Sequence, residues 1–388
     1  MKSLNFLAYP IHLLNKQMME NKLHRKVIKT NHLDITLLED NPFIKNMNKN
    51  GVYEYSYSET SDVPSLYSSL YALLYYDLIN KKEVLTTETK EKWINYIKSF
   101  QSDDGLLRDP SVSNEIAETE DWWGWRHLTL HGIMGLTILG GRFDKKFKVI
   151  EDLKQDDRWI NFLDSRDWKN KPDFVSNEIQ NYGTMLQYSR DIFGDQKSGE
   201  MINTLFDFLD KKQDSETGLW GPPFNNKYYL SRGVQTAYHF LMLYFYDNRE
   251  VNYVDSIKDS CLKTQNNLGG FGVQLNSSAC EDIDSIDPLS RLYFMTNYKN
   301  HEIEKSLEKA LKWVLVNQNE EGGFVFKRYE SFVYGHENMS SVKNKSAMFP
   351  TWFRTLSLAY LSKVVDDSEL RKINWKFIDC PGLQFWHL

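Results

Sequence analysis

The chain has 388 residues, a net charge of −6 and a pI near 5.9, with 41% hydrophobic and 26% charged residues. This acidic balance excludes the basic surface that a nucleic-acid-binding protein needs, so we expect no nucleic-acid partner. The absence of any run of about 18 apolar residues excludes a predicted transmembrane helix, while peripheral contact with a membrane stays open. Aromatic residues make up 14% of the chain, a share that suits a large core and also a deep pocket lined with rings.

The first 55 residues have the least regular pattern in the chain. Their start, Met1–Leu14, is briefly apolar but has no small-residue cleavage site, so we interpret it as mature protein rather than a signal peptide. The three cysteines form neither a metal-type spacing nor an even disulfide set, which is typical of the reducing cytoplasm. They are Cys261, Cys280 and Cys380.

Six segments are apolar around most of their helical circumference, which predicts helices buried on all sides. They are Pro64–Ile79, Trp123–Leu139, Val175–Ile192, Ser231–Tyr246, Ile286–Met295 and Phe349–Val364. No segment shows the sustained two-residue alternation between hairpin turns that would predict a β-sheet.

Between these segments one design recurs: an amphipathic helix, a glutamine, three or four polar residues, a glycine and a large apolar residue. The glutamines are Gln101, Gln213, Gln265 and Gln318. Their spacings are 112, 52 and 53 residues, so we expect one eroded copy near residues 157–170, where Trp159 and Trp168 remain. A glycine just past a helix provides a left-handed cap, and a glutamine amide can bond backbone groups freed at the helix end. These residues are therefore predicted to be structural.

Buried helices that alternate with amphipathic ones predict an inner and an outer ring of helices. We therefore expect an all-α fold, a single (α/α)6 barrel or α-toroid of about six helical hairpins. It would occupy residues 1–388 as one domain, with residues 1–55 as a less regular lead-in.

The repeats resemble the QW motif of squalene-hopene and oxidosqualene cyclases, which has the form Gln-x-x-x-Gly-x-Trp/Phe. Over residues 90–330 the chain is similar to the superfamily of terpenoid cyclases and protein prenyltransferases, whose members are α-toroids. This resemblance is specific for the fold and much less specific for activity, because function resides in the site.

The densest group of acids lies at a predicted inner helix start, where four carboxylates occur between Glu281 and Asp287. Crowded carboxylates repel one another, which raises the pKa of at least one of them. Class II terpenoid cyclases carry an Asp-x-Asp-Asp motif at this place, and its middle aspartate protonates an alkene or epoxide. Asp282-Ile283-Asp284-Ser285 matches three of its four positions. The resemblance therefore implies Asp284 as the catalytic acid, with Asp282 and Asp287 beside it.

The prenyltransferase pattern is not met. That family holds zinc with Asp-x-Cys and a later histidine, whereas this chain has Cys280-Glu281-Asp282 in the reverse order and no histidine in residues 346–358. A tetrahedral zinc site cannot be assembled from these residues, and we expect no metal and no cofactor.

A second dense segment combines tryptophans with basic residues at another predicted helix start. Its rings could stack on sugars, stabilise a carbocation through cation–π attraction, or simply fill the barrel. The candidate binding residues there are Trp122, Trp123, Trp125, Arg126 and His131.

Further candidates occur at the remaining predicted helix starts. They are Tyr182, Arg232, Trp352 and Arg354. Arginines suit carboxylate or phosphate ligands and could equally pair with the acid cluster. Other polar residues at such starts are each more typical of structural roles: His127, Asn177, Gln235 and His239.

Three functions fit this pattern. The first is a terpenoid-cyclase-like enzyme that carries out acid-initiated cyclisation or isomerisation of an isoprenoid in an aromatic cavity. The second is a carbohydrate-active (α/α)6 enzyme, either a glycoside hydrolase, a lyase or an epimerase, which the polar mouth favours. The third is a non-catalytic binding toroid. No phosphate-binding loop, nucleophile elbow or His-Glu-x-x-His helix occurs. The expected partner is a small molecule or glycan in the barrel, and the oligomeric state is undetermined.

Overall fold

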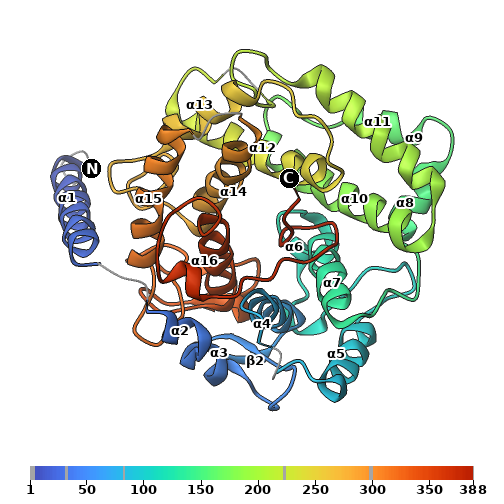
Figure 1. Ribbon diagram of the computed structural model, residues 1–388, viewed down its shortest axis with the longest axis horizontal. Coiled ribbons are helices and arrows are strands. Elements are labelled where there is room, and N and C mark those ends of the chain that lie inside the picture. Colours follow the sequence, from blue (N-terminus) through green and yellow to red (C-terminus); the bar gives the residue numbers. More distant parts are fainter. Residues whose placement is uncertain (1–4, 31–33, 82–83, 222–223, 297–299, 388) are drawn as a thin grey trace.

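The computed structural model describes residues 5–30, 34–81, 84–221, 224–296 and 300–387, with side chains from residue 16 onward. Six apolar helices of this part of the chain stand side by side in a ring (Figure 1). They are α4 (Leu66–Leu78), α7 (Trp125–Leu139), α10 (Pro172–Phe193), α12 (Lys227–Tyr246), α14 (Ala279–Met295) and α16 (Met348–Leu361). Each packs against the next, and α16 packs against α4, so the ring closes. The predicted all-α fold is confirmed, and the closed ring of six inner helices is the arrangement expected of an α-toroid.

The outer layer alternates with this ring. Its members are α5 (Thr87–Ser99), α8 (Lys148–Glu151), α9 (Arg158–Asp164), α11 (Gln196–Lys212), α13 (Val254–Thr264) and α15 (His301–Val316). Helices α8 and α9 share one outer position, between α7 and α10, and the sixth position is taken by two short helices, α2 (Ile35–Glu39) and α3 (Pro42–Met47). Between them, Asn41 donates to the Gly322 carbonyl (3.0 Å) and to the Tyr75 hydroxyl (3.0 Å), which joins the last outer turn to the first inner helix.

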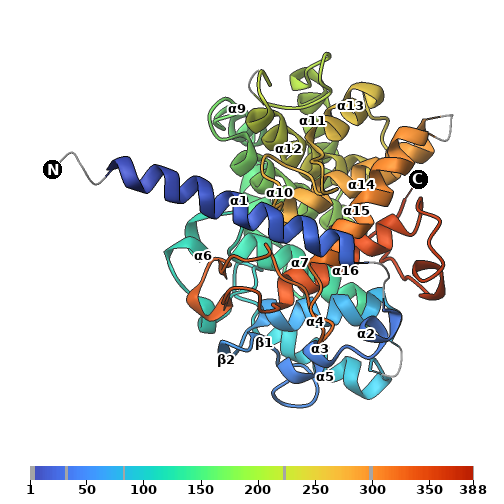
Figure 2. The same cartoon turned by 90° about the vertical axis from the view of Figure 1, so that its left-hand side faces the viewer.

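Helix α1 (Asn5–Lys29) lies outside the ring and packs on α15, beyond which its N-terminal half projects (Figure 2). The predicted lead-in thus contains three helices among its described residues. No helix in the described ranges is both long and apolar enough to cross a membrane.

The glutamine–glycine turns form the hydrogen bonds and adopt the glycine conformations that the repeat predicts. Each glutamine side chain donates to the carbonyl of its own turn's glycine; Gln265, for example, bonds Gly269 at 2.9 Å and the Ser306 carbonyl of the next outer helix at 2.8 Å. Gly269 has φ +99°, and a Cβ there would lie 2.2 Å from the Lys309 carbonyl oxygen. The turn therefore requires glycine both for its backbone conformation and for the close approach of the neighbouring helix.

The eroded repeat copy is the short outer helix α9. Trp159 donates to the Met201 carbonyl (2.9 Å), and Trp168 donates to the Leu163 carbonyl (2.8 Å) at the end of α9. These two tryptophans therefore still anchor an outer element between α7 and α10, although the glutamine and glycine of the repeat are lost.

The remaining elements are short and gather around the ring. They are α6 (Glu115–Thr119), the 3₁₀ helices η1 (Pro110–Val112), η2 (Asp152–Lys154), η3 (Glu337–Met339) and η4 (Leu370–Lys372), and the strands β1 (Ser56–Ser58), β2 (Ser61–Pro64), β3 (Phe332–Val333) and β4 (Ser340–Ser341). The strands form two antiparallel pairs, β1 with β2 and β3 with β4. The pair β3–β4 belongs to residues 326–347, which we call the mouth loop.

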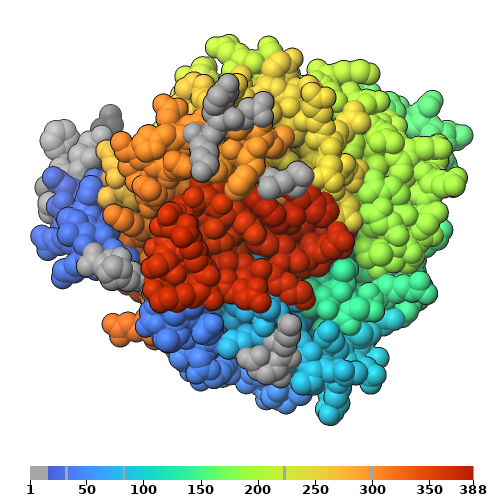
Figure 3. Space-filling view, in the orientation of Figure 1, coloured from blue at the N-terminus to red at the C-terminus, as the bar shows by residue number. Residues whose placement is uncertain are grey.

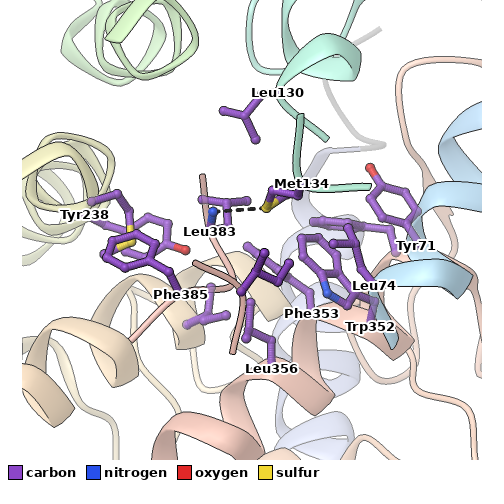
Figure 4. Close-up of a cluster of buried hydrophobic side chains, with 14 of the residues drawn as sticks. Tyr71, Leu74, Leu130, Met134, Tyr238, Trp352, Phe353, Leu356, Leu383 and Phe385 are labelled. Atoms are coloured by element: carbon purple, nitrogen blue, oxygen red, sulfur yellow. Dashed lines mark hydrogen bonds between the residues drawn. The ribbon is translucent and has the colours of Figure 1, made fainter. Parts of the chain in front are cut away.

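The two ends of the inner ring are closed differently. At the carboxyl ends of the inner helices, residues 373–387, which we call the tail, run across the centre of the ring (Figure 3). Tail residues Leu383 and Phe385 insert among Met134, Leu356 and other apolar side chains of the ring (Figure 4). The amino ends of the inner helices lie on the opposite side of the ring, and most of the candidate site residues predicted from the sequence are found there.

Candidate functional site

A cavity of about 210 Å³ lies among the amino-terminal halves of the inner helices. It is lined by side chains of or next to five inner helices, of the mouth loop and of the tail. They are Trp122, His127, His131, Asn177, Gln180, Gln235, Tyr238, His239, Cys280, Asp284, Phe326, Phe332, Tyr334, Phe349, Phe353 and Leu383. A larger hollow of about 370 Å³ lies outside the ring, between α15 and the segment after α16, among surface lysines and acids. Buried, convergent polar groups distinguish the central cavity from this hollow, so the central cavity is the candidate site.

Asp284 is the carboxyl group that faces the cavity. Its side chain is 3% exposed and forms no hydrogen bond or ion pair with any other described residue. Burial raises its pKa well above the ordinary value, and the nearby carboxylates of Glu281 and Asp282 add to this rise. Burial and these neighbours both favour the protonated acid, which can donate a hydrogen bond or a proton.

Asp282 is surrounded by hydrogen-bond donors. It forms an ion pair with Arg354 (2.8 Å) and accepts hydrogen bonds from the Trp313 indole (2.9 Å), the Ser277 hydroxyl (2.7 Å) and the Phe271 amide (3.0 Å). Its oxygens therefore tie α14 to α15, to α16 and to the turn after α13. The structure does not bring this predicted catalytic residue to the cavity.

The Asp287 side chain is also buried, on the side of the ring that the tail covers. It forms an ion pair with Arg291 (2.7 Å), and both side chains are fully buried. Burial raises the pKa of Asp287 to about 6, and Arg291 opposes that rise. Successive residues of an α-helix are rotated by about 100°, so positions 282, 284 and 287 point in three different directions. The three predicted aspartates therefore face three different surroundings.

Three histidines share the cavity, and their hydrogen bonds assign their tautomers. The Ser176 hydroxyl donates to the Asp173 carbonyl (2.8 Å), so the Nδ1–H of His239 must donate to Ser176 Oγ (2.9 Å). His131 likewise uses its Nδ1–H, because its partner is the carbonyl oxygen of His127 (2.8 Å).

The same reasoning applies to His127. The Tyr67 hydroxyl donates to the Gly124 carbonyl (2.7 Å), so the Nδ1–H of His127 donates to the Tyr67 oxygen (3.0 Å). In all three rings the Nε2 atom therefore carries the free lone pair.

Burial keeps these imidazoles neutral. It lowers the pKa of His131 to about 4 and lowers the pKa values of His127 and His239 as well. His239 is the least buried of the three rings. The cavity thus combines neutral bases with a carboxylic acid.

Several buried polar atoms at the cavity have no protein partner. Among the described residues, His131 Nε2, Gln180 Nε2 and the Tyr238 hydroxyl form no hydrogen bond, although all three side chains are at least nine-tenths buried. Leaving such groups unpaired costs about 1–3 kcal/mol each. Three such atoms around one cavity offer hydrogen bonds to a polar ligand there.

Some residues of the tryptophan segment line the cavity, and the others hold the fold together. Trp122 lines the cavity, whereas Trp123 is buried, stacks on Tyr67 (5.4 Å between ring centroids) and supports the backbone of Gly335 in the mouth loop. Trp125 donates to Glu118 (2.7 Å). Of this segment's predicted binding residues, Trp122 and His131 reach the cavity.

The predicted arginines are paired with acids. Arg126 holds Asp121 with two bonds (2.6 and 2.8 Å), and Arg354 is held by Asp282. Arg232 pairs with Asp173 above the cavity, at the amino ends of α10 and α12. None of these three guanidinium groups lines the cavity.

Tyr182 and Trp352 also lie outside the cavity lining. Tyr182 packs against Phe162 with ring centroids 4.9 Å apart, and Trp352 donates to the Gln384 side chain of the tail (2.8 Å). Both rings thus fix the inner ring to its surroundings. Within the described residues, no group of three histidine, cysteine or acidic side chains is placed to hold a metal ion.

Sequence reasoning missed several lining residues. Gln180, Tyr238, Tyr334 and Leu383 were not singled out, and His127 and His239 were interpreted as structural. Helical spacing carries a usable signal here: His127 and His131, and likewise Gln235 and His239, are four residues apart and so share one helix face. No sequence signal places Leu383, which reaches the cavity from the tail.

Comparison with known proteins assigns no family. No family description and no curated protein matches the chain. The solved structures with a similar fold include a polysaccharide lyase, which is 12% identical, covers 90% of this chain and 98% of its own, and superposes with a TM-score of 0.49. A likeness of this degree does not assign a function.

Proposed function

We propose that this protein is a carbohydrate-active enzyme that removes a proton from a sugar carbon, either a lyase or an epimerase. One observation carries the proposal: neutral imidazoles with free Nε2 lone pairs and an unpaired carboxylic acid meet in one cavity of about 210 Å³. Base and acid groups that face the same space are what a proton-transfer reaction requires.

The hydrolase alternative has less support. Glycoside hydrolysis needs two carboxyl groups about 5–10 Å apart across the substrate. Among the described residues that line the cavity, Asp284 supplies one carboxyl group and no second one is present. Asp282 and Asp287 are engaged in buried ion pairs, so neither can act as the partner.

The chemistry of proton removal points to uronic acids. A sugar C–H bond becomes acidic when it lies next to a carboxyl group, as at C5 of a uronate. We assign His239 as the base, because it is the least buried imidazole and Ser176 holds its ring by the Nδ1–H (2.9 Å). Protonated Asp284 would donate to the substrate carboxylate, where negative charge grows in the transition state.

The step balances without a cofactor. His239 Nε2 takes the C5 proton, the C4–O bond breaks, and a C4=C5 double bond forms. The departing oxygen receives a proton from the Tyr238 hydroxyl, which lines the cavity without a protein partner. If the C4–O bond instead stays intact and the Tyr238 hydroxyl protonates C5 on the face opposite His239, the result is epimerisation, with the C5 proton left on His239.

The test is product analysis with purified protein. We expect a rise in the ultraviolet absorbance of unsaturated uronate, or deuterium incorporation at C5 in D₂O, with uronate-containing polysaccharides and not with neutral ones. His239→Gln and Asp284→Asn should each lower the rate about 100-fold or more. His301→Gln, on α15 outside the ring, is the matched control, because its side chain is 87% exposed. Hydrolysis of neutral glycans, or unaltered rates in both cavity variants, would overturn the proposal.

A second candidate is acid-initiated cyclisation of an isoprenoid. It is favoured by the protonated state of Asp284 beside the rings of Trp122, Tyr334 and Phe349, which could stabilise a carbocation. The neutral histidines weigh against it, because a lone pair would take a proton from such a cation. Turnover of squalene or isoprenoid diphosphates that depends on Asp284, detected by mass spectrometry, would favour this candidate.

A further inference from the structure

The floor of the cavity is closed by the tail. Leu383 lines the cavity from below, and its backbone amide contacts the sulfur of Met134 (3.2 Å), as Figure 4 shows. Arg291 holds the next turn of the tail by donating to the carbonyls of Phe385 (2.7 Å) and His387 (3.1 Å). A ligand therefore cannot pass through the ring from one side to the other.

The mouth loop covers part of the upper side. Phe326 and Phe332 stack at 3.8 Å between ring centroids, and Tyr334 stacks on Phe349 of α16 at 4.3 Å. These rings form a wall over α14 and α16, with all four facing the cavity.

The mouth loop is anchored along its length. Asn114 donates to the Gly335 carbonyl (2.8 Å), Asn338 donates to the Ser111 carbonyl (2.9 Å), and Ser58 donates to the Ser340 carbonyl (2.6 Å). The mouth loop therefore covers the α14 and α16 side of the cavity, whereas Phe174 and Tyr228, near the amino ends of α10 and α12, are 42% and 49% exposed.

Polar side chains of α10 and α12 continue from the cavity lining toward the amino ends of these two helices. On α12, positions 228, 232, 235 and 239 are spaced by three or four residues and share one face of the helix; on α10, positions 173, 177 and 180 do the same. The two faces meet, because Arg232 pairs with Asp173 and His239 bonds Ser176. We call the seven residues at these positions the entry groove.

An aromatic ring stands at the upper end of the entry groove. Tyr228 is 49% exposed, and its ring lies 5.6 Å from the Arg232 guanidinium carbon. Eleven residues separate Tyr228 from His239, which corresponds to about 16 Å along the helix. The entry groove is thus long enough for sugar units beyond the one in the cavity.

We propose that the cavity takes the terminal unit of a uronate-containing chain and that the enzyme acts from the chain end. This inference rests on the proposed function and adds a binding mode to it. A cavity whose floor is closed by the tail and whose wall is the anchored mouth loop favours the end of a chain over its middle. Tyr228 and Arg232 then bind a unit further along, through ring stacking and hydrogen bonds to hydroxyls.

The positions of the reacting groups also select which end enters. His239 and Asp284 lie in the cavity, so the ring that loses its C5 proton is the enclosed one. The C4–O bond that breaks joins this ring to the next unit, so the chain must leave through O4. The enclosed ring is therefore the reducing-end unit, and the lyase reaction releases it as an unsaturated monosaccharide.

The experiment follows product size over time with a uronate oligosaccharide series. We expect unsaturated monosaccharide from the first turnover, with the remaining chains shortening by one unit at a time. A bulky fluorescent label on the reducing end should block the reaction, and the same label on the other end should not. Unsaturated products of many lengths at early times would overturn the binding mode and leave the lyase function intact. No unsaturated or deuterated product from any uronate would overturn both.

A pair of neighbouring variants tests the entry groove. Tyr228→Ala should raise KM for long oligosaccharides about 3- to 10-fold with kcat unchanged, and should leave KM for the disaccharide unaltered. Tyr229→Ala is the matched control, because Tyr229 is similarly exposed (41%) but is rotated by about 100° away from the groove face. Equal effects of the two variants, or an equal effect of Tyr228→Ala on all chain lengths, would contradict the assignment.

Discussion

The two ends of the inner ring are built from the same six helices but treat their polar groups in opposite ways. At the tail end, Arg291 and Asp287 form a fully buried ion pair, and the remaining guanidinium donors bond tail carbonyls. At the cavity end, Asp284 and the Nε2 atom of His131 have no partner among the described residues. The difference indicates that the tail end holds the ring together through a buried ion pair, whereas the cavity end keeps polar groups without protein partners, as a ligand site requires.

The largest expected effect comes from breaking the tail-end pair. Arg291→Met leaves Asp287 as an uncompensated buried carboxylate and removes four guanidinium–ring contacts, with Phe245, Tyr360, Phe385 and Trp386. We expect a loss of about 3–5 kcal/mol in the free energy of unfolding, measured by denaturant titration. A loss below about 1 kcal/mol would show that the tail is held by its apolar contacts alone.

The next effect is a pH dependence that originates at the cavity end. The folded pKa of His131, about 4, lies below the unfolded value of about 6.5, so its neutral form stabilises the fold above pH ~6.5. This contribution is lost as the pH falls toward about 4, by up to ~3 kcal/mol. His131→Gln should flatten the fall in unfolding free energy between pH 7 and pH 5. An unchanged slope would contradict the buried, neutral state of this ring.

The titration of Asp287 changes the unfolding free energy in the opposite direction over a similar pH range. Its folded pKa of about 6 exceeds its ordinary value, so its contribution is present at low pH and is lost as the pH rises toward about 6. The contribution of His131 is therefore measured as the difference in unfolding free energy between wild type and His131→Gln at each pH.

A smaller effect is expected at the turns that connect the hairpins. Gly269→Ala should destabilise by about 2 kcal/mol or more, because an alanine at φ +99° is strained and its Cβ would meet the Lys309 carbonyl at 2.2 Å. Gly140→Ala is the control, since Gly140 has φ +75° with no atom near a Cβ, and should cost about 1 kcal/mol. Thermal unfolding of both variants decides whether packing adds to backbone strain.

The smallest expected effect on stability belongs to Asp284, in contrast to Arg291. Asp284→Asn replaces an unpaired buried carboxyl, whose pKa burial raises, by a neutral amide, so its stability relative to wild type should rise, by about 1 kcal/mol at most, when the pH increases from 5 to 8. A strong destabilisation at both pH values would place Asp284 in the scaffold rather than in the site.

The prediction from sequence succeeded where local rules govern structure. The glutamine–glycine turns, the buried helices and their alternation follow from side-chain periodicity and from glycine's backbone freedom, which act within a few residues. The acid cluster was placed on the correct inner helix, although α14 begins at Ala279, earlier than the predicted Ile286. The relation to terpenoid cyclases stays a prediction.

The candidate site was predictable only in part. Asp284, Trp122 and His131 were named and line the cavity, whereas Asp282, Asp287, Arg126 and Arg354 are taken up by ion pairs. Those pairs join residues on different elements, such as Arg354 and Asp282, which are 72 positions apart. A motif cannot reveal such a partner, because it describes one segment and not what packs against it.

The sequence by itself determined that this chain forms hairpins of buried and amphipathic helices, because helical periodicity and capping are local properties. Tertiary structure alone decided which acid is free and which is paired, since a buried carboxyl takes its role from the groups around it. Tertiary structure also decided that the tail closes the floor of the cavity, so that no open channel runs through the ring. That outcome depends on Leu383, a tail residue that lines the cavity beside α7 although it lies 249 positions from Met134 in the sequence.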